Sequence, residues 1–219
     1  MLAPMLNPTK TELHTMSRTL IAGLFGAALL LTAGQGIAQD LTQDPAAVKS
    51  GTYAVEPTHT KVVFAINHLG YSTYYGTFPK AEGTLVLDAA NPAKSVLDVT
   101  VDVTAISTDL KELNEHLLSP DFFDGAKFPK ATFKSTKVEL TGKNKAKVTG
   151  NLTLKGVTKP VTLDVTFNQA GPNFINKVYS VGFDATTTIK RSDFGVSAYV
   201  PAVGDEVTLR IGSELQLKK

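Results

Sequence analysis

The chain has 219 residues, contains no cysteine, and carries a formal net charge of only +2 at pH 7. The lack of cysteine excludes disulfides, thiolate chemistry and acylation on cysteine. The nearly balanced charge gives no electrostatic reason to expect a nucleic-acid partner. Stability must therefore come from a hydrophobic core, which a single domain of this size can supply.

The N-terminal region predicts a secretory signal. Arg18 precedes an uncharged stretch over residues 19–39, whose apolar centre spans residues 20–31 and is followed by small residues. This order is typical of a signal peptide, so we expect cleavage after Ala38 and a periplasmic protein. The alternative is an uncleaved membrane helix, which the glycines in the stretch disfavour. Met16 could be the true start, because residues 1–15 resemble neither a signal nor a domain.

Removing residues 1–38 would leave 20 basic and 19 acidic residues. No later apolar run is long enough to cross a bilayer, so the cleaved protein is not expected to be an integral membrane protein. We expect residues 39–50 to form a polar linker and residues 51–219 to form one domain.

From Gly51 onward, apolar and polar residues alternate, as in strands with one buried face. Val62, Phe64 and Ile66 share one face with His68, and similar patterns recur about eight times between short turns. The sequence thus predicts an all-β fold, either a sandwich or an eight-stranded antiparallel barrel. The interior of such a barrel can be filled by side chains or can hold one small ligand.

Residues 109–135 interrupt this alternation. A three-to-four spacing of leucines predicts a short helix over residues 110–118. Four phenylalanines, Phe122, Phe123, Phe128 and Phe133, then follow within a dozen residues. A long aromatic connection suggests a plug or lid over an apolar interior. Periodicity alone favours a solid core, but it does not distinguish a filled barrel from a cavity.

Motifs for chemistry are weak. The histidines lack the spacing of a metal site, and no metal ligand is predicted. A triad could be assembled from Ser107, His116 and Asp121, but no nucleophile elbow supports it. Lys190 and Arg191 could meet an anionic head group at a cavity mouth. Alternatively, Arg191 pairs at the surface with Asp193 or Glu206.

Several motifs together are similar to the YceI-like family. They are THTKVVFAINHLG (58–70), YGTFPKAEGTL (75–85), the stretch from Ile106 to Ser135, GNLTLKGVTKPVTL (150–163) and IKRSDFGV (189–196). The resemblance implies an extended, lipocalin-like antiparallel barrel in the periplasm that encloses a polyisoprenoid or isoprenoid-quinone chain. By the same resemblance, Phe64, Ile66 and His68 would line the tunnel, and Phe122 and Phe123 would line or cap it.

One departure from the family pattern lies in the predicted helix. The family usually has Arg-Asp where this chain has Leu113 and Asn114. Arg191 falls on the arginine of the family's RSDFG motif. The change at the helix puts lid stability or ligand polarity in question.

We therefore expect a binding protein without catalytic residues or cofactor, whose partner is an isoprenoid lipid. An incompletely closed barrel would also leave an edge at which two copies could pair. The alternatives are an enzyme that uses His68 or His116 as a base, and a filled barrel that acts through its surface. The predicted ligand-binding residues are Val62, Phe64, Ile66, His68, Leu69, Phe78, Leu117, Phe122, Phe123, Phe128, Phe133, Phe183, Arg191 and Phe194.

Overall fold

The computed structural model describes residues 40–219. The predicted signal, its cleavage site and the alternative start at Met16 lie outside these residues. Ten strand segments are present: β1 (Gly51–Val55), β2 (Lys61–His68), β3 (Ser72–Phe78), β4 (Ala81–Leu87), β5 (Val96–Asp102), β6 (Lys130–Gly142), β7 (Lys145–Leu154), β8 (Val157–Pro172), β9 (Tyr179–Lys190) and β10 (Val203–Leu217). The helices are α1 (Lys111–Leu117) and the short 3-10 turns η1 (Pro45–Ala47), η2 (Pro92–Lys94), η3 (Val103–Ala105) and η4 (Arg191–Phe194). None of the helices in this part of the chain is long and apolar enough to span a membrane.

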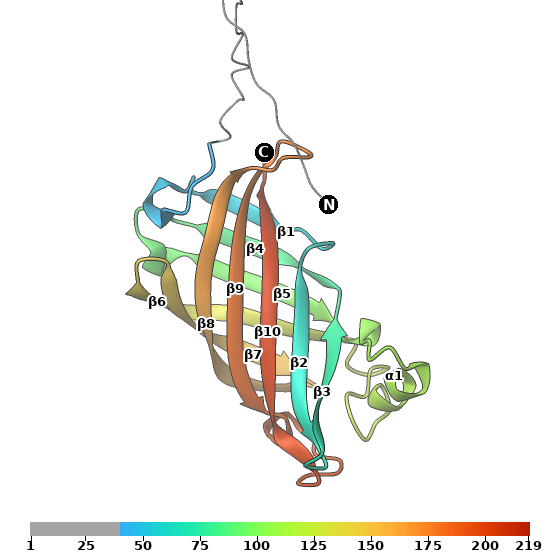
Figure 1. The fold of residues 1–219 in the computed structure, drawn as a ribbon. Coiled ribbons are helices and arrows are strands. Elements are labelled where there is room, and N and C mark those ends of the chain that lie inside the picture. The colour runs from blue at the N-terminus through green and yellow to red at the C-terminus, as the bar shows by residue number, and fades with distance from the viewer. Residues whose placement is uncertain (1–39) are drawn as a thin grey trace, which may run out of the picture. The chain divides into compact units, whose positions relative to one another are not determined.

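The ten segments close into an eight-stranded antiparallel barrel (Figure 1). Both β1 and β2 pair with β10, so they act as one long strand that is broken near Pro57. In the same way, β3 and β4 act as one broken strand, because β3 pairs with β2 and β4 pairs with β1. The ring closes through the pairing of β1 with β10. The predicted eight-stranded barrel is confirmed, and the two breaks explain why ten segments make eight strands.

Alternation decides which side chains face inward. On β2, the side chains of Val62, Phe64 and Ile66 reach the interior, whereas the side chain of Lys61 is exposed. The same parity holds on β5, where Leu97, Val99 and Val101 point inward. Because side chains on a strand alternate between the two faces, each strand contributes one apolar row to the barrel interior.

One end of the barrel is densely packed. Tyr53 is completely buried there, together with Val181 and Ala170, and the Tyr53 hydroxyl donates to the carbonyl oxygen of Lys49. Val48 joins this cluster at 7 % exposure. This cluster packs one end of the barrel, and α1 lies toward the other end (Figure 1).

The stretch expected to be a linker takes part in this packed end. Thr42 and Ala170 exchange two backbone hydrogen bonds of 2.8 Å, and the carboxylate of Asp44 accepts from the backbone N–H of Ala46 at the start of η1. Residues 40–50 are polar overall, so their composition predicts a linker, but the buried Val48 side chain and the backbone pairing of Thr42 attach them to the barrel.

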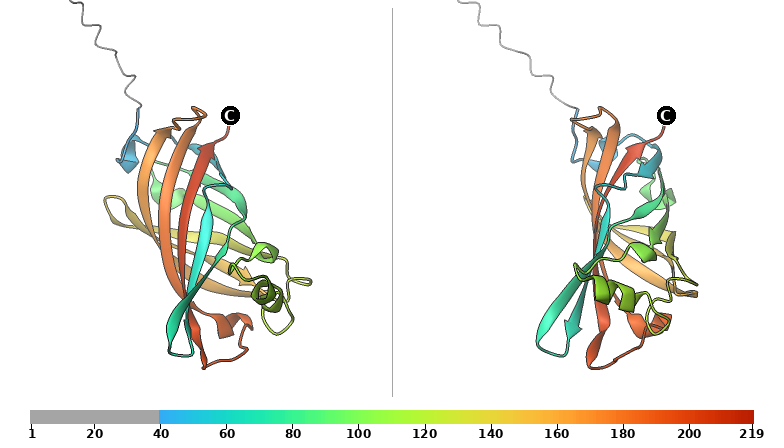
Figure 2. Two further views of the ribbon diagram at one scale, coloured as in Figure 1. Left: turned by 45° about the vertical axis from the view of Figure 1, so that its right-hand side comes forward. Right: turned by 90° about the vertical axis from the view of Figure 1, so that its right-hand side faces the viewer.

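The insert between β5 and β6 contains α1, as the leucine spacing predicts. It lies beside β3, whose outer edge is paired only at Thr77 with Ser107 among the described residues (Figures 1 and 2). The insert therefore stands where the sheet leaves β3 largely unpaired. Pairing of two copies at this edge remains a prediction.

Candidate ligand-binding cavity

The barrel encloses a cavity of about 610 Å³. Its lining runs from Val48 and Asn144 at the packed end to His116 and Tyr199 at the end that carries α1. The walls between these ends are almost entirely apolar, and their polar residues include Thr60 just before β2, Thr187 on β9 and Ser213 on β10. The solid core favoured by periodicity alone is therefore wrong. The inward-facing rows of side chains are apolar in both a filled and a hollow barrel. Whether rows from opposite walls touch depends on how the barrel closes.

The structure brings most of the predicted ligand-binding residues together around this cavity. Eleven of them line it: Val62, Phe64, Ile66, His68, Phe78, Leu117, Phe122, Phe123, Phe133, Phe183 and Arg191. They come from β2, β3, β6, β9, η4 and the insert, so the wall is assembled from segments distant in sequence. Contact of these residues with a ligand remains a prediction.

Three predicted residues lie outside the cavity. Leu69 follows β2 in the turn to β3 and is 49 % exposed to solvent. Phe128 packs over the turn at Gly156, where a Cβ atom would come within 2.7 Å of its ring. Phe194 is buried in η4 without lining the cavity. Each is apolar and close to a lining residue in sequence, but its side chain points elsewhere.

An aromatic cluster connects the insert with the barrel wall. The Phe64 and Phe78 ring centroids are 5.8 Å apart, and the Phe78 and Phe123 rings meet edge to face at 5.7 Å. Such edge-to-face contacts are favourable beyond the area that they bury. The insert therefore contributes Phe123 as part of the wall beside β3, in agreement with the predicted lid or plug.

A second aromatic group lies at the α1 end of the cavity. The rings of His116 and Phe122 are 5.0 Å apart, and Tyr199 lies 6.0 Å from Phe122. Tyr199 was missed by the sequence analysis because it lies in an irregular loop without periodicity. Tyr74 was also missed, although its position on β3, four residues before Phe78, has the inward parity that could have identified it.

Arg191 lines the cavity, but its guanidinium is held by backbone groups and not by a surface carboxylate. Its contact with an anionic head group stays a prediction. Its side chain is only 6 % exposed, and Nε, Nη1 and Nη2 donate to the carbonyl oxygens of Gly204, Val196 and Val203 at 2.8, 2.8 and 2.9 Å. Burial lowers the pKa of Arg191, and the negative charge of Asp205 partly opposes this effect. The predicted surface ion pair is wrong, because the guanidinium instead holds the backbone between η4 and β10.

The departure from the family pattern in α1 has a local explanation. Leu113 lines the cavity, so this chain presents an apolar side chain where an arginine is usual for the family. The Asn114 side-chain oxygen accepts from the backbone N–H and the hydroxyl of Thr108, each at 2.8 Å. Asn114 therefore holds the chain ahead of α1, and no charge is needed for this contact.

The histidines do not form the catalytic arrangement considered above. Among residues 40–219, no hydrogen bond joins Ser107 to His116, and Ser107 uses its backbone to pair with Thr77. His68 lies beside Tyr74, with ring centroids 6.0 Å apart. Both His68 and His116 line the cavity, but no nucleophile is bonded to either ring.

One group of potential metal ligands was missed by the sequence analysis. Glu56, His59 and Glu214 bring a nitrogen and two carboxylates within 4.8 Å of one another. However, the Glu56 oxygens already accept from Thr58 and from both the backbone N–H and Nδ1 of His59. These hydrogen bonds close the turn between β1 and β2, which is sufficient to explain the cluster.

The chain matches the YceI-like domain over residues 53–215. It is 39 % identical over 200 residues to the protein YceI of Escherichia coli O157:H7, covering 91 % of this chain and 97 % of that protein. The crystal structure of Burkholderia cenocepacia BcnA is similar with a TM-score of 0.67 and 30 % identity, covering 73 % of this chain and 98 % of BcnA.

A second solved structure shares the fold at lower identity. It is described as a polyisoprenoid binding domain from Saccharophagus degradans, and its TM-score is 0.57 at 13 % identity, covering 78 % of this chain and 100 % of that one. The extent of the matches and the closed eight-stranded barrel together establish that this chain belongs to the YceI-like family.

Proposed function

We propose that this protein binds a lipid with a long polyisoprenoid tail, such as an isoprenoid quinone, inside the barrel and carries it without transforming it. The observation that carries this proposal is the elongated, apolar cavity of about 610 Å³. This volume falls in the range of small-molecule sites, roughly 300–1,000 Å³. The related domain from Saccharophagus degradans, described as polyisoprenoid binding, supports the same class of ligand.

The lining favours a tail over a compact polar ligand. Each buried methylene contributes roughly 0.8 kcal/mol, so a long tail gains affinity simply by leaving water. Polar lining groups gather toward the two ends. Lys143, Asn144 and Lys145 lie at one end, and the other end has His68, His116, Arg191 and Tyr199. An apolar middle between polar ends fits a molecule with a long tail and a small head group.

Export would place the carrier between two membranes. We propose that residues 1–38 are removed during secretion and that the remaining protein works in the periplasm, where it moves a water-insoluble lipid through an aqueous space. The basic start, the apolar run over residues 20–31 and the small residues before Gln39 support this proposal. The mass of the protein recovered from a periplasmic fraction tests it directly.

The first prediction concerns the bound lipid. Ala185 faces the cavity on β9, whereas its neighbour Thr186 is exposed on the outer face. Ala185→Phe would place a ring in the cavity, and Thr186→Phe adds the same ring outside. We expect mass spectrometry of organic extracts to find a stoichiometric isoprenoid lipid in the wild-type protein and in Thr186→Phe, but little in Ala185→Phe. Thermal melts would confirm that both variants fold.

Other outcomes would reject this proposal. A wild-type protein that carries no lipid after periplasmic purification, and that also ignores added quinones and polyprenyl phosphates, would not be an isoprenoid carrier. Equal lipid content in folded Ala185→Phe and Thr186→Phe would place the ligand elsewhere than in the barrel.

A further inference from the structure

The end of the molecule beside the cavity mouth carries no formal charge over two adjacent loops. One loop is the turn between β2 and β3, and the other is the connection from η4 to β10. No aspartate, glutamate, lysine or arginine occurs in residues 62–79 or in residues 194–204. We call the projecting part of these loops, residues 68–75 and 197–202, the uncharged tip. The two loops lie side by side below the barrel in both views of Figure 2.

Backbone contacts fix the two loops against each other. The N–H of Leu69 donates to the carbonyl oxygen of Ala202 at 3.1 Å, and His68 pairs with Val203 across the β2–β10 ladder. The N–H of Val203 also donates to the carbonyl oxygen of Tyr199 at 2.8 Å. The backbone of the tip is therefore held as a single projection.

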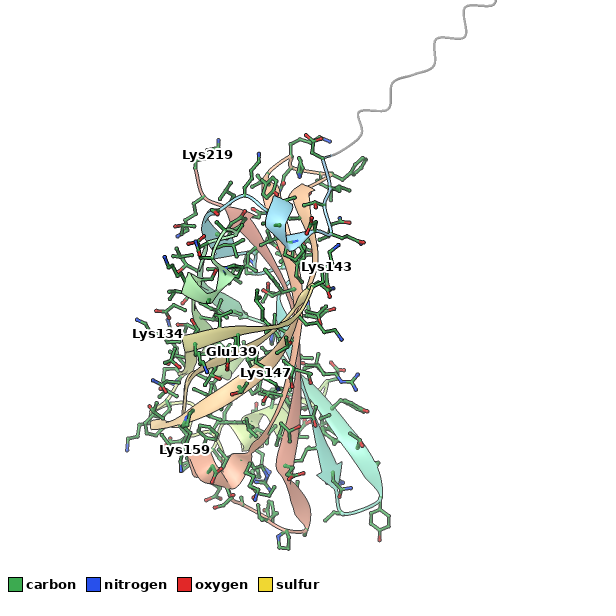
Figure 3. All side chains as sticks on the ribbon, turned by 90° about the vertical axis from the view of Figure 1, so that its left-hand side faces the viewer. Lys134, Glu139, Lys143, Lys147, Lys159 and Lys219 are labelled. Atoms are coloured by element: carbon green, nitrogen blue, oxygen red, sulfur yellow. The ribbon has the colours of Figure 1, made fainter. Side chains whose placement is uncertain are left out.

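The tip exposes large apolar and aromatic side chains. Tyr71 is 90 % exposed, Tyr199 62 %, Tyr75 61 % and Leu69 49 %. Elsewhere, the outer face of β5–β8 is rich in charge, with ion pairs such as Lys134–Asp98 and Lys147–Asp164. Figure 3 labels charged residues of β6–β8, among them Lys134, Lys147 and Lys159, and none of the labelled residues lies on the projecting β2–β3 hairpin. The tip thus differs in chemistry from the charged wall.

The uncharged tip borders the cavity. His68, Tyr74 and Tyr199 belong to the loops or to the strand ends beside them, and all three line the cavity together with His116 of α1. The other end of the barrel holds the cluster around Tyr53, whose members Val48 and Leu215 also line the cavity. A ligand that enters at the end that carries α1 passes the tip.

We propose that the uncharged tip docks on the surface of a lipid bilayer, with Leu69 and Tyr71 inserted at the level of the head groups. Tyrosine is enriched at membrane–water interfaces because its ring is apolar and its hydroxyl stays hydrated. A projecting side chain such as Tyr71 needs no complementary pocket in a bilayer, whereas a protein partner would have to provide one. The absence of charge fits the neutral interfacial region of a membrane.

Docking at this end would join the cavity mouth to the place where isoprenoid lipids reside. This step rests on the proposed lipid-binding function, but binding to a bilayer can be measured independently of it. Since the tip carries no charge, its binding should depend little on anionic lipid or on salt. Binding that depended on lysines would weaken steeply at high salt or without anionic lipid.

The opposite end of the molecule supplies a matched control. Phe174 and Ile175, in the turn between β8 and β9, are 77 % and 84 % exposed. Like Leu69 and Tyr71, they are exposed apolar or aromatic side chains that do not line the cavity, but they lie away from the uncharged tip. The double variants Leu69→Asn/Tyr71→Ser and Phe174→Ser/Ile175→Ser therefore each remove two exposed apolar side chains from opposite ends. Asparagine suits position 69, where φ is +56°.

The experiment is flotation of the purified protein with phosphatidylcholine vesicles. The full chain is expressed and exported, and its mass shows whether residues 1–38 remain. This check is needed because the apolar run in these residues would itself bind vesicles. We expect wild-type binding to change little between low salt and about 1 M salt. Binding should fall by at least about tenfold in the Leu69/Tyr71 variant and stay within about twofold in the Phe174/Ile175 variant.

Several results would overturn the proposal: no wild-type binding to vesicles, an equal loss in both double variants, or a loss confined to the Phe174/Ile175 variant. A Leu69/Tyr71 variant that binds vesicles normally but changes from dimer to monomer in light scattering would assign the tip to a second copy of the chain. The lipid content of each variant separates this proposal from the carrier function. We expect the Leu69/Tyr71 variant to retain cavity lipid, and Ala185→Phe to lose it and still float.

Discussion

Arg191 links three backbone carbonyl groups in the interior, and its contribution should be to stability. Arg191→Met would leave the carbonyls of Val196, Val203 and Gly204 without these donors. At about 1 kcal/mol or more for each lost partner, we expect the free energy of unfolding to fall by at least about 3 kcal/mol. Urea denaturation measures this loss. The matched control is Arg210→Met on the exposed face of β10, where a change within about 0.5 kcal/mol is expected. Similar small losses in both variants would show that the carbonyls do not need the guanidinium.

Glu56 makes stability depend on acid. Burial alone would raise the pKa of Glu56, but hydrogen bonds from the Thr58 hydroxyl and from the backbone and ring of His59 outweigh burial and lower it from 4.5 to about 2. The folded protein therefore favours the ionised carboxylate. The resulting stability is present above the unfolded-state pKa and is lost as the pH falls from about 4.5 toward 2.

Glu56→Gln tests this dependence. We expect the variant to lose stability less steeply than the wild type between pH 4.5 and pH 2, because the group that titrates differently in the two states is gone. Melting temperatures measured across this range give the slope. Glu112→Gln on the exposed face of α1 should keep the wild-type slope. Identical slopes for wild type and Glu56→Gln would reject the assignment.

Single residues also show where sequence reasoning reaches its limit. The RSDFG motif marks Arg191 as notable, but which carbonyls it meets depends on β10, which begins a dozen residues later. Similarly, the role of Glu56 as the centre of a turn is local, whereas its approach to Glu214 requires β10 to return beside β1. Side-chain roles that depend on the return of a distant strand were not predictable from spacing.

At the level of elements, the contact between β2 and β3 depends on a glycine. Gly76 lies directly opposite Phe64 in the ladder, and a Cβ atom at position 76 would overlap the Phe64 ring and come within 3.0 Å of the Ser107 carbonyl oxygen. Gly76→Ala should therefore push the Phe64 ring into the cavity. We expect the free energy of unfolding to fall by roughly 1–3 kcal/mol, as in other overpacked sites, and the bound lipid to decrease.

The control for this variant is Gly142→Ala at the end of β6, where the nearest atom to an added Cβ is 3.7 Å away. Urea denaturation and lipid extraction of both variants provide the measurements. If Gly76→Ala is as stable and as lipid-rich as Gly142→Ala, the ring of Phe64 is free to move, and the cavity wall at this point is not rigid.

Most elements were predictable because their pattern is local. The alternation of Val62, Phe64 and Ile66 marks β2, and the leucine spacing marks α1. The packed stretch over residues 40–50 was not predictable, because its attachment depends on Val48 and on two backbone hydrogen bonds to Ala170. A polar composition describes solvent-exposed side chains well, but it contains no information about backbone pairing with a distant strand.

At the level of the whole molecule, the closed barrel could be predicted, whereas the alternating pattern did not predict its hollow interior, which only the resemblance to the YceI-like family implied. Inward rows of valine, leucine and phenylalanine are equally compatible with a filled barrel and with a cavity. Whether the interior is filled or hollow depends on the distance between opposite walls of the barrel. The number of strands and their stagger together determine this distance. The aromatic residues of the insert, such as Phe122 and Phe123, were predicted near this interior, although the periodic pattern alone favoured a solid core.

The course of β10 has a practical consequence for experiments on this protein. The strand begins at Val203 beside the uncharged tip, and it ends at Leu217 against β1, so its 15 residues separate the two regions by roughly 50 Å along the chain. A fluorescent reporter or an immobilisation tag fused after Lys219 would therefore stand far from the tip and from the cavity mouth. A protein immobilised through its C-terminus would present the uncharged tip to vesicles in a defined orientation.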